Sequence, residues 1–288
     1  MFDDILVPTD GSTCAAVALS AAEAMAKRYG ATIHLLSVAD ARIEDHTVGD
    51  ESQHAAHEAI VRDARENLSA EIGVVEAVER GLPHEAIVEY ADEASVDLVI
   101  MGTHGRTGVQ RYVLGSVTEK VLRLAETPVL TVRGEDADVR PTPFEDVLIP
   151  TDGSDAANAA IDPALDIAGA YDARVHTLSA IEPLSMGVDV RSHVIVEALE
   201  ERAQAAVDGV AERAESASLG PIETAVEFGD PYRQIRNYVE ENDIDLVVMG
   251  THGRSGVERF LLGSVTEKLV RTSAAPVMTV RQPENSGD

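Results

Sequence analysis

The sequence predicts two consecutive α/β domains, each built on a parallel β-sheet that helices cover on both faces. The chain has 288 residues and a mass of 30.6 kDa, which is the size of about two domains. Residues 102–133 and 250–281 are identical at 21 of 32 aligned positions, so one unit occurs twice. Within each unit, short apolar runs alternate with helical segments, which is typical of buried parallel strands joined by right-handed crossovers.

Each element of the first half follows from a local signal. Apolar runs bounded by turn residues predict strands at 4–8, 32–38, 74–79, 97–101 and 128–132. Helices are predicted at 12–29, near 52–72, from 83 onward and at 115–125. Ser12 can cap the first helix and Gly30 can end it, while Pro83 suits a first helical position because no amide donor is needed there. The second half is expected to repeat this order.

Two pairs of landmarks place the domain boundaries. Asp4–Ser12 matches Asp146–Ser154 at an offset of 142 residues, and the later repeat has an offset of 148. The segment between the halves is charged, holds two prolines and lacks apolar periodicity, as an exposed linker does. We therefore expect a first domain at 1–133, a linker at 134–143, a second domain at 144–281 and a tail at 282–288.

The charge balance limits the partners of the protein. Fifty-one acidic residues against 23 basic ones give a formal charge of −28 and a pI of about 4.5. Such a surface repels phosphate backbones, so nucleic-acid binding is not expected. Only three basic residues are lysines, which resembles proteins of salt-accumulating halophiles such as haloarchaea, where the Debye length is about 3 Å at molar salt. An ordinary acidic cytosolic protein is the alternative.

Composition also excludes several classes of protein. Hydrophobic residues make up 44% and charged residues 26%, as in globular proteins. No apolar run approaches the roughly 18 residues that a membrane span needs, and the first residues lack the basic segment of a signal peptide, so we expect a cytoplasmic protein. The single cysteine, Cys14, excludes a disulfide framework. Because its counterpart is Ala156, Cys14 is expected to be a small packing residue of a helix.

Glycines recur at one spacing after the fourth predicted strand of each half. Gly102-Thr-His-Gly105 is followed after nine residues by Gly115-Ser116, and the second half has the same spacing. Glycine lets the backbone approach a ligand, adjacent amides can form an anion nest, and the helix starting here offers free amides to a phosphate. The alternative is structural: the glycines only turn the chain, and Ser116 with Glu119 forms a capping box on the same amides.

An acidic residue follows the first predicted strand of each half, at Asp10 and Asp152. In doubly wound sheets, ligands bind beyond the carboxyl ends of the strands where the strand order reverses, and a carboxylate there can accept hydrogen bonds from ribose hydroxyls. The surrounding Thr-Asp-Gly-Ser sequence is equally suited to an Asx-turn.

Together these segments resemble the universal stress protein family, and the whole chain looks like a tandem two-domain member. The family's ATP-binding signature, G-x2-G-x9-G-[S/T], occurs in both halves, beside VPTDGS and LIPTDGS after the first strands. The resemblance covers almost the whole chain apart from the linker and the tail. It implies two Rossmann-like domains of the adenine nucleotide alpha hydrolase-like type, with five parallel strands each. It also implies ATP as ligand. Slow hydrolysis of this ATP is possible if Mg²⁺ bridges the phosphates, since magnesium needs few protein ligands.

The same resemblance implies site residues. Ribose would be held by Asp10 and Asp152. Adenine would be bordered by Pro8, Thr9, Val38 and Met101 in the first half, and by Pro150, Thr151, Ala180 and Met249 in the second. Phosphates would meet Gly102, Gly105, Gly115, Ser116, Val117 and Thr118, and in the second half Gly250, Gly253, Gly263, Ser264, Val265 and Thr266. Ala180 is smaller than the branched residue that is usual there. The family also implies that two domains pair through their last strands, here 129–132 and 277–280, and that tandem chains form a homodimer.

Other polar residues are weaker candidates. His104 and His252 lie inside the signature and can contact phosphate, respond to pH or simply occupy a turn. His34 and His176 are expected to be satisfied groups of the core or an interface. Positive charges near the signature can attract nucleotide or balance nearby acids (Arg106, Arg111, Lys120, Arg254, Arg259 and Lys268). The remaining histidines considered lie on different segments and make a weak metal site (His54, His57 and His193).

These observations lead to one main functional hypothesis and two alternatives. The main one is an ATP-binding stress-response and signalling module, without assigned catalytic or metal-binding residues, because the usual P-loop, GxGxxG, GxSxG and HExxH motifs are absent. A slow ATPase or nucleotidyl-transfer enzyme on the same fold is the second. An interaction scaffold that binds AMP, a cyclic nucleotide or no nucleotide is the third.

Overall fold

The computed structural model of the protein describes residues 2–42, 50–105, 114–134, 144–182, 193–220, 222–253 and 262–282. The chain divides into two compact units, Met1–Pro143 and Phe144–Asp288. Each unit is a parallel α/β fold, which confirms the predicted fold class. The expected linker lies largely outside the described residues, as does most of the tail.

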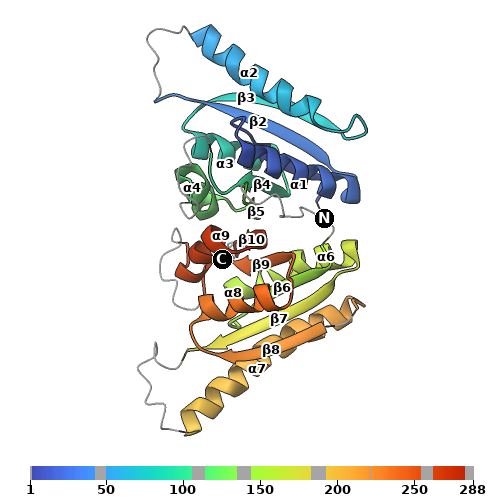
Figure 1. The fold of residues 1–288 in the computed structure, drawn as a ribbon, viewed down its shortest axis with the longest axis vertical. Helices are drawn as coiled ribbons and strands as arrows, with labels where there is room; N and C mark the ends of the chain where they lie inside the picture. Colours follow the sequence, from blue (N-terminus) through green and yellow to red (C-terminus); the bar gives the residue numbers. More distant parts are fainter. Residues whose placement is uncertain are drawn as a thin grey trace, which may run out of the picture. The chain divides into compact units, whose positions relative to one another are not determined.

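The first unit follows the predicted alternation of strands and helices (Figure 1). In chain order its elements are β1 (Asp4–Pro8), α1 (Thr13–Tyr29), β2 (Thr32–Asp40), α2 (Asp50–Glu66), β3 (Val74–Gly81), α3 (Pro83–Glu93), β4 (Leu98–Gly102), α4 (Ser116–Leu124) and β5 (Val129–Val132). The strands run parallel in the order β3-β2-β1-β4-β5. The strand order therefore reverses between β1 and β4, and the carboxyl ends of these strands define the expected ligand position.

The second unit repeats this sheet. Its strands are parallel in the order β8-β7-β6-β9-β10, so the reversal lies between β6 and β9. In chain order its elements are β6 (Asp146–Pro150), α5 (Asp155–Asn158), α6 (Ile161–Tyr171), β7 (Arg174–Ile181), α7 (His193–Ser216), β8 (Ile222–Phe228), α8 (Pro231–Glu241), β9 (Leu246–Gly250), α9 (Ser264–Thr272) and β10 (Val277–Val280).

Helices cover both faces of each sheet. In the first unit α1 contacts β1, β4 and β5, α2 contacts β2 and β3, and α3 packs beside α4. Right-handed crossovers place α1 and α2 on one face and α3 and α4 on the other, because the chain steps one way from β1 to β3 and the opposite way from β3 to β5. This explains the uninterrupted apolar runs: Ile5, Leu6 and Val7 are all fully buried.

The first helix of each unit shows how local sequence sets the element ends. The Ser12 side chain accepts a hydrogen bond from the Ala15 amide at 3.2 Å and caps α1, and Gly30 ends α1 with φ of 73°. In the second unit the corresponding helix is split into α5 and α6, contrary to the expected repeat. Pro163 explains the break, since its ring would clash with the carbonyl four residues earlier in a continuous helix, whereas the first turn of α6 tolerates it.

A hydrogen-bonded Asp–His–Tyr set with a buried histidine ties each sheet to a helix at the amino ends of the strands. In the first unit, His34 Nε2 lies 3.0 Å from Asp4 Oδ1, and His34 Nδ1 lies 3.0 Å from Tyr90 Oη. The second unit repeats both contacts at 2.8 and 3.1 Å (Asp146, His176 and Tyr238). The two histidines are therefore satisfied core groups, which confirms that prediction.

Candidate functional site

The loop after β1 holds the candidate ribose acid in a tight turn. The Ser12 amide donates a hydrogen bond to Asp10 Oδ1 at 3.0 Å, and Gly11 adopts φ of 76°. The second unit has the same turn, with the Ser154 amide 2.9 Å from Asp152 Oδ1. The Asx-turn expected from Thr-Asp-Gly-Ser is thus present. It engages Oδ1 of each carboxylate and fixes the direction in which Oδ2 points.

The second carboxylate oxygen faces the glycine segment that follows β4. A Cβ atom placed on Gly105 would lie 2.5 Å from Asp10 Oδ2, and one on Gly253 would lie 2.7 Å from Asp152 Oδ2. Any side chain at either glycine would therefore have to displace the carboxylate. Two segments that are 95 residues apart in the first half and 101 in the second meet here, at the point where the strand order reverses.

The helix that follows the signature begins without a side-chain cap. Gly115 is the N-cap of α4 and Gly263 is the N-cap of α9, and neither helix has a side-chain capping bond within the described residues. Ser116 is the first residue of α4 rather than its cap, so the capping box considered for Ser116 and Glu119 does not form. The first amides of both helices are thereby left for another acceptor, and such amides favour anions.

Short hydrogen bonds fix the start of these helices against the preceding strand. The Gly115 amide donates to the Thr103 carbonyl at 2.8 Å, and Thr118 Oγ1 donates to the Gly102 carbonyl at 2.9 Å. The second unit repeats both bonds at 2.8 and 3.1 Å (Thr251, Gly263, Gly250 and Thr266). Thr118 and Thr266, which the resemblance assigns to phosphate, are buried and already hold the backbone of the loop.

The first glycine of each signature is required by packing. A Cβ on Gly102 would lie 2.6 Å from Cys14 Sγ, and a Cβ on Gly250 would overlap the Ala156 carbonyl. Cys14 is buried and its thiol lies 3.5 Å from the Val132 carbonyl. Cys14 is therefore a packing residue of α1, as predicted, and Gly102 and Gly250 let the first helix lie close to the sheet.

The remaining candidate residues lie around the same carboxyl ends. Val38 and Ala180 are half-buried near the ends of β2 and β7, and Met101 and Met249 are buried near the ends of β4 and β9. Thr9 and Thr151 are buried directly after β1 and β6. Six further candidate residues border these positions (Pro8, Pro150, Ser116, Val117, Ser264 and Val265). The two serines are exposed, and the other four are half-buried or buried.

Polar and charged groups near the loops differ between the units. His84 lies at the start of α3, where burial and then the positive charge of Lys120 hold its pKa below the usual value. Its counterpart Tyr232 has Lys268 Nζ 5.6 Å from its ring centre, and a hydrogen bond with Thr272 lowers its pKa. The signature histidines each contact the preceding threonine at 3.1 Å (His104 and His252). The signature arginines lie outside the described residues (Arg106, Arg111, Arg254 and Arg259).

A hydrogen-bonded connection behind the first loop was not predicted. Ser37 Oγ donates to the Thr9 carbonyl at 2.9 Å and lies 2.8 Å from His57 Nδ1. This chain of contacts joins α2, β2 and the loop that carries Asp10. His57 was noted in the sequence only as a weak metal candidate, and no group of three metal-binding side chains occurs among the described residues. In the second unit Ala203 occupies the matching place on the helix, so this histidine contact has no counterpart.

The fold and these loops define a pair of doubly wound α/β units, each with a glycine segment and an acidic turn at its strand-order reversal. The sequence pattern of the universal stress protein family matches residues 1–133 and 143–281. The chain belongs to this family, with two family domains in tandem.

Individual relatives agree with this assignment. A universal stress protein of Methanocaldococcus jannaschii is 34% identical over 144 residues, which are 49% of this chain and 84% of that protein. One of Mycobacterium tuberculosis is 30% identical over 204 residues, or 69% of this chain and 66% of that protein. The crystal structure of a universal stress protein from Archaeoglobus fulgidus has the same fold, with a TM-score of 0.74 at 22% identity and coverage of 97% and 98%.

No helix within the described ranges combines the length and the apolar character needed to cross a bilayer.

Proposed function

We propose that each half of the chain binds one molecule of ATP and that the protein is a nucleotide-dependent stress-response and signalling module. The observation that carries this proposal is the meeting of Asp10 with Gly105, and of Asp152 with Gly253, at the reversal of the strand order. One carboxylate oxygen is held by the turn and the other faces the glycine segment. A ribose and a phosphate chain need these two kinds of group side by side.

In this proposal different residues bind the ribose, the phosphates and the base of the nucleotide. The carboxylates of Asp10 and Asp152 accept hydrogen bonds from ribose hydroxyls. The uncapped amides at the starts of α4 and α9 bind phosphate oxygens, because helix N-termini carry partial positive charge. Val38 and Met101 form apolar contacts with the base. Mg²⁺ would be held mainly by the phosphates and water, since it needs few protein ligands.

The two sites are expected to differ in affinity. Ala180 offers less apolar surface to the base than Val38, and the second loop lacks a counterpart of the His57 contact that steadies the first loop. A tenfold difference in affinity corresponds to only about 1.4 kcal/mol, which one altered contact can supply. We therefore expect the first half to bind ATP more tightly.

Isothermal titration of the full chain with ATP tests the proposal. The wild-type protein should show up to two sites per chain. Asp10→Ala should weaken the tighter site about tenfold and leave the other unchanged, because it removes hydrogen bonds to one ribose. Asp152→Ala is the matched control and should affect only the weaker site. Gly105→Val should block the first site by steric overlap, with circular dichroism to check that the variant is folded.

The outcome of this titration separates the functional classes. Absence of binding at millimolar ATP would overturn the proposal and leave an interaction scaffold. Preference for AMP or cAMP over ATP would change the ligand but keep the site. Steady release of phosphate or AMP, abolished by Ser116→Ala with Ser264→Ala, would instead indicate an enzyme. The proposed module acts in the cytoplasm as a homodimer, and light scattering during gel filtration measures the dimer independently of nucleotide.

A further inference from the structure

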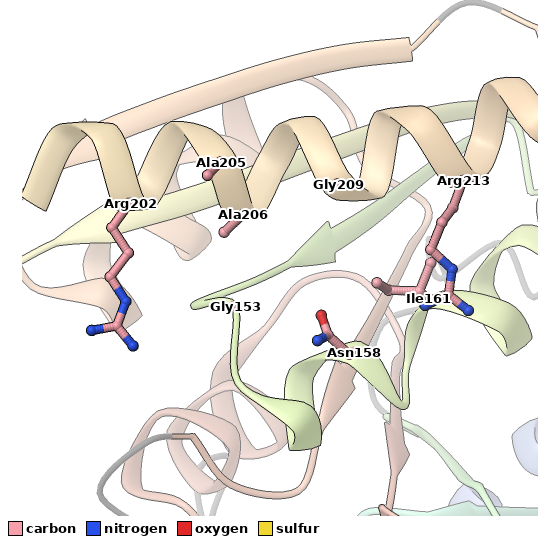
Figure 2. A pocket seen from close by; sticks show the side chains of 8 residues that line it. All are labelled: Gly153, Asn158, Ile161, Arg202, Ala205, Ala206, Gly209 and Arg213. Carbon is pink, nitrogen blue, oxygen red and sulfur yellow. The ribbon is translucent and has the colours of Figure 1, made fainter.

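The second unit contains a cavity beside its longest helix, α7. It has a volume of about 380 Å³ and lies between α7 and the α5–α6 segment (Figure 2). Its lining consists of Gly153, Asn158, Ile161, Arg202, Ala205, Ala206, Gly209 and Arg213. The described residues of the glycine signature do not line it, and neither does Asp152. The cavity is open to solvent, since most of its lining residues are exposed and only Ile161 is buried. Its volume is in the range of pockets for small organic molecules.

Two arginines line this cavity, although the chain is strongly acidic. Arg202 and Arg213 are eleven residues apart, which is about three helical turns, so both arginines project from the same side of α7, at opposite ends of the cavity (Figure 2). Arg213 pairs with Asp162. Arg202 makes no ion pair within the described part of the chain, although the protein carries a net charge of −28. Among the described residues that line the cavity there is no acidic one, so its polar groups favour an anion.

A glycine in the middle of α7 keeps the cavity open. Gly209 lies well inside this 24-residue helix, where glycine is less favourable than alanine because it loses more backbone entropy on folding. Packing does not require it, since a Cβ atom at Gly209 would meet nothing within 4 Å. A side chain here would instead extend into the space between the helices. Gly209 thus makes α7 less stable than alanine would, and it leaves the cavity unfilled.

The first unit has neither this arginine nor this glycine, which separates the cavity from the duplicated site. The buried residues of the two helices align at an offset of 146, with Val61 matching Val207. At this offset Arg202 corresponds to Ala56 and Gly209 corresponds to Asp63. A nucleotide site shared by both halves therefore does not require the arginine or the glycine.

We propose that this cavity binds a small organic anion, with a phosphate, sulfonate or carboxylate group at Arg202 and an apolar body that lies along Ala205 and Ala206. A guanidinium matches such oxyanions with two parallel N–H groups. Asn158 projects from α5 toward α7 and offers a further hydrogen bond to the ligand (Figure 2). The cavity is independent of the proposed ATP sites except that Gly153 directly follows Asp152.

Binding of 8-anilinonaphthalene-1-sulfonate, an aromatic sulfonate with fluorescence sensitive to its surroundings, tests the proposal on the full chain. The wild-type protein should show one saturable site. Arg202→Gln should weaken binding about tenfold through loss of a charge-assisted hydrogen bond. Arg236→Gln, which removes an exposed arginine of α8, is the matched control and should leave the affinity unchanged. Saturating ATP should not displace the probe, so the result is independent of nucleotide binding.

Substitutions at Gly209 show whether probe binding is lost because a side chain fills the cavity or because the protein unfolds. Gly209→Ala should raise the melting temperature by about 2 °C through helix propensity and weaken probe binding. Gly209→Leu should abolish binding while circular dichroism remains that of the folded chain. The proposal is overturned if the wild type shows no saturable site, if ATP displaces the probe, or if Arg202→Gln and Gly209→Leu bind it as tightly as the wild type.

Discussion

At the scale of single residues, the Asp–His–Tyr sets, each with a buried histidine, show how polar groups stabilise the amino ends of each sheet. Tyr90→Phe removes only the hydroxyl that pairs with His34 Nδ1 and leaves a ring nitrogen without its partner in the interior. We expect a loss of about 1 kcal/mol in the free energy of unfolding, since a buried polar group that loses its partner costs this much. Urea unfolding followed by circular dichroism measures the loss.

The second unit supplies the matched experiment. Tyr238→Phe removes the corresponding hydroxyl beside His176 and should cost a similar amount. Because the two sets share no residues, the double variant should lose the sum of both changes. If Tyr90→Phe unfolds at the same urea concentration as the wild type, the hydrogen bond makes no net contribution to the free energy of unfolding, and packing alone holds the aromatic ring in place.

At the scale of elements, the split of the first helix in the second unit has one cause that can be removed. Pro163→Ala restores a backbone donor in the first turn of α6 and removes the ring that prevents a continuous helix. We expect α5 and α6 to join, with slower hydrogen exchange of the amides at 159–164. The reverse substitution, Ala21→Pro at the matching place in α1, should cost about 3 kcal/mol in the free energy of unfolding. Unchanged exchange in Pro163→Ala would mean that packing, not proline, sets the break.

The same elements show which features the sequence could predict. The strands were predictable because burial on both faces leaves uninterrupted apolar runs, as in Ile5–Val7. The meeting of Asp10 with Gly105 followed from the topology, since both come directly after strands at the reversal. The break before α6 was missed because a proline is compatible with a first turn, so the sequence does not distinguish a new helix from a continued one.

Features that depend on packing between helix and sheet could not be predicted. The contact of His57 with Ser37 requires α2 to lie over β2 in one rotational position. Hydrophobic periodicity predicts which face of a helix is buried, but not which residue of that face meets a given strand residue. The cavity beside α7 arises because Ala205, Ala206 and Gly209 are small on one face. Each is an ordinary helix residue in the sequence, and only the structure shows that nothing fills the space opposite them.

At the scale of the whole molecule, the net charge of −28 sets the response to salt. Dense negative charge destabilises the folded chain by self-repulsion, and the Debye length shortens from about 10 Å at 0.1 M salt to about 3 Å at 1 M. We expect the melting temperature to rise between these KCl concentrations, by about 2–4 °C for each kcal/mol of repulsion that the salt screens. Differential scanning calorimetry measures this rise.

A charge-reduced variant separates screening from other effects of salt. Glu200, Glu201 and Glu212 are exposed on α7, and changing all three to Gln lowers the magnitude of the net charge by three without removing a described ion pair. If repulsion dominates, this variant should melt at a higher temperature than the wild type in 0.1 M KCl and gain less from added salt. If both proteins gain equally, screening of these three charges does not cause the gain, and this acidic face has little part in stability.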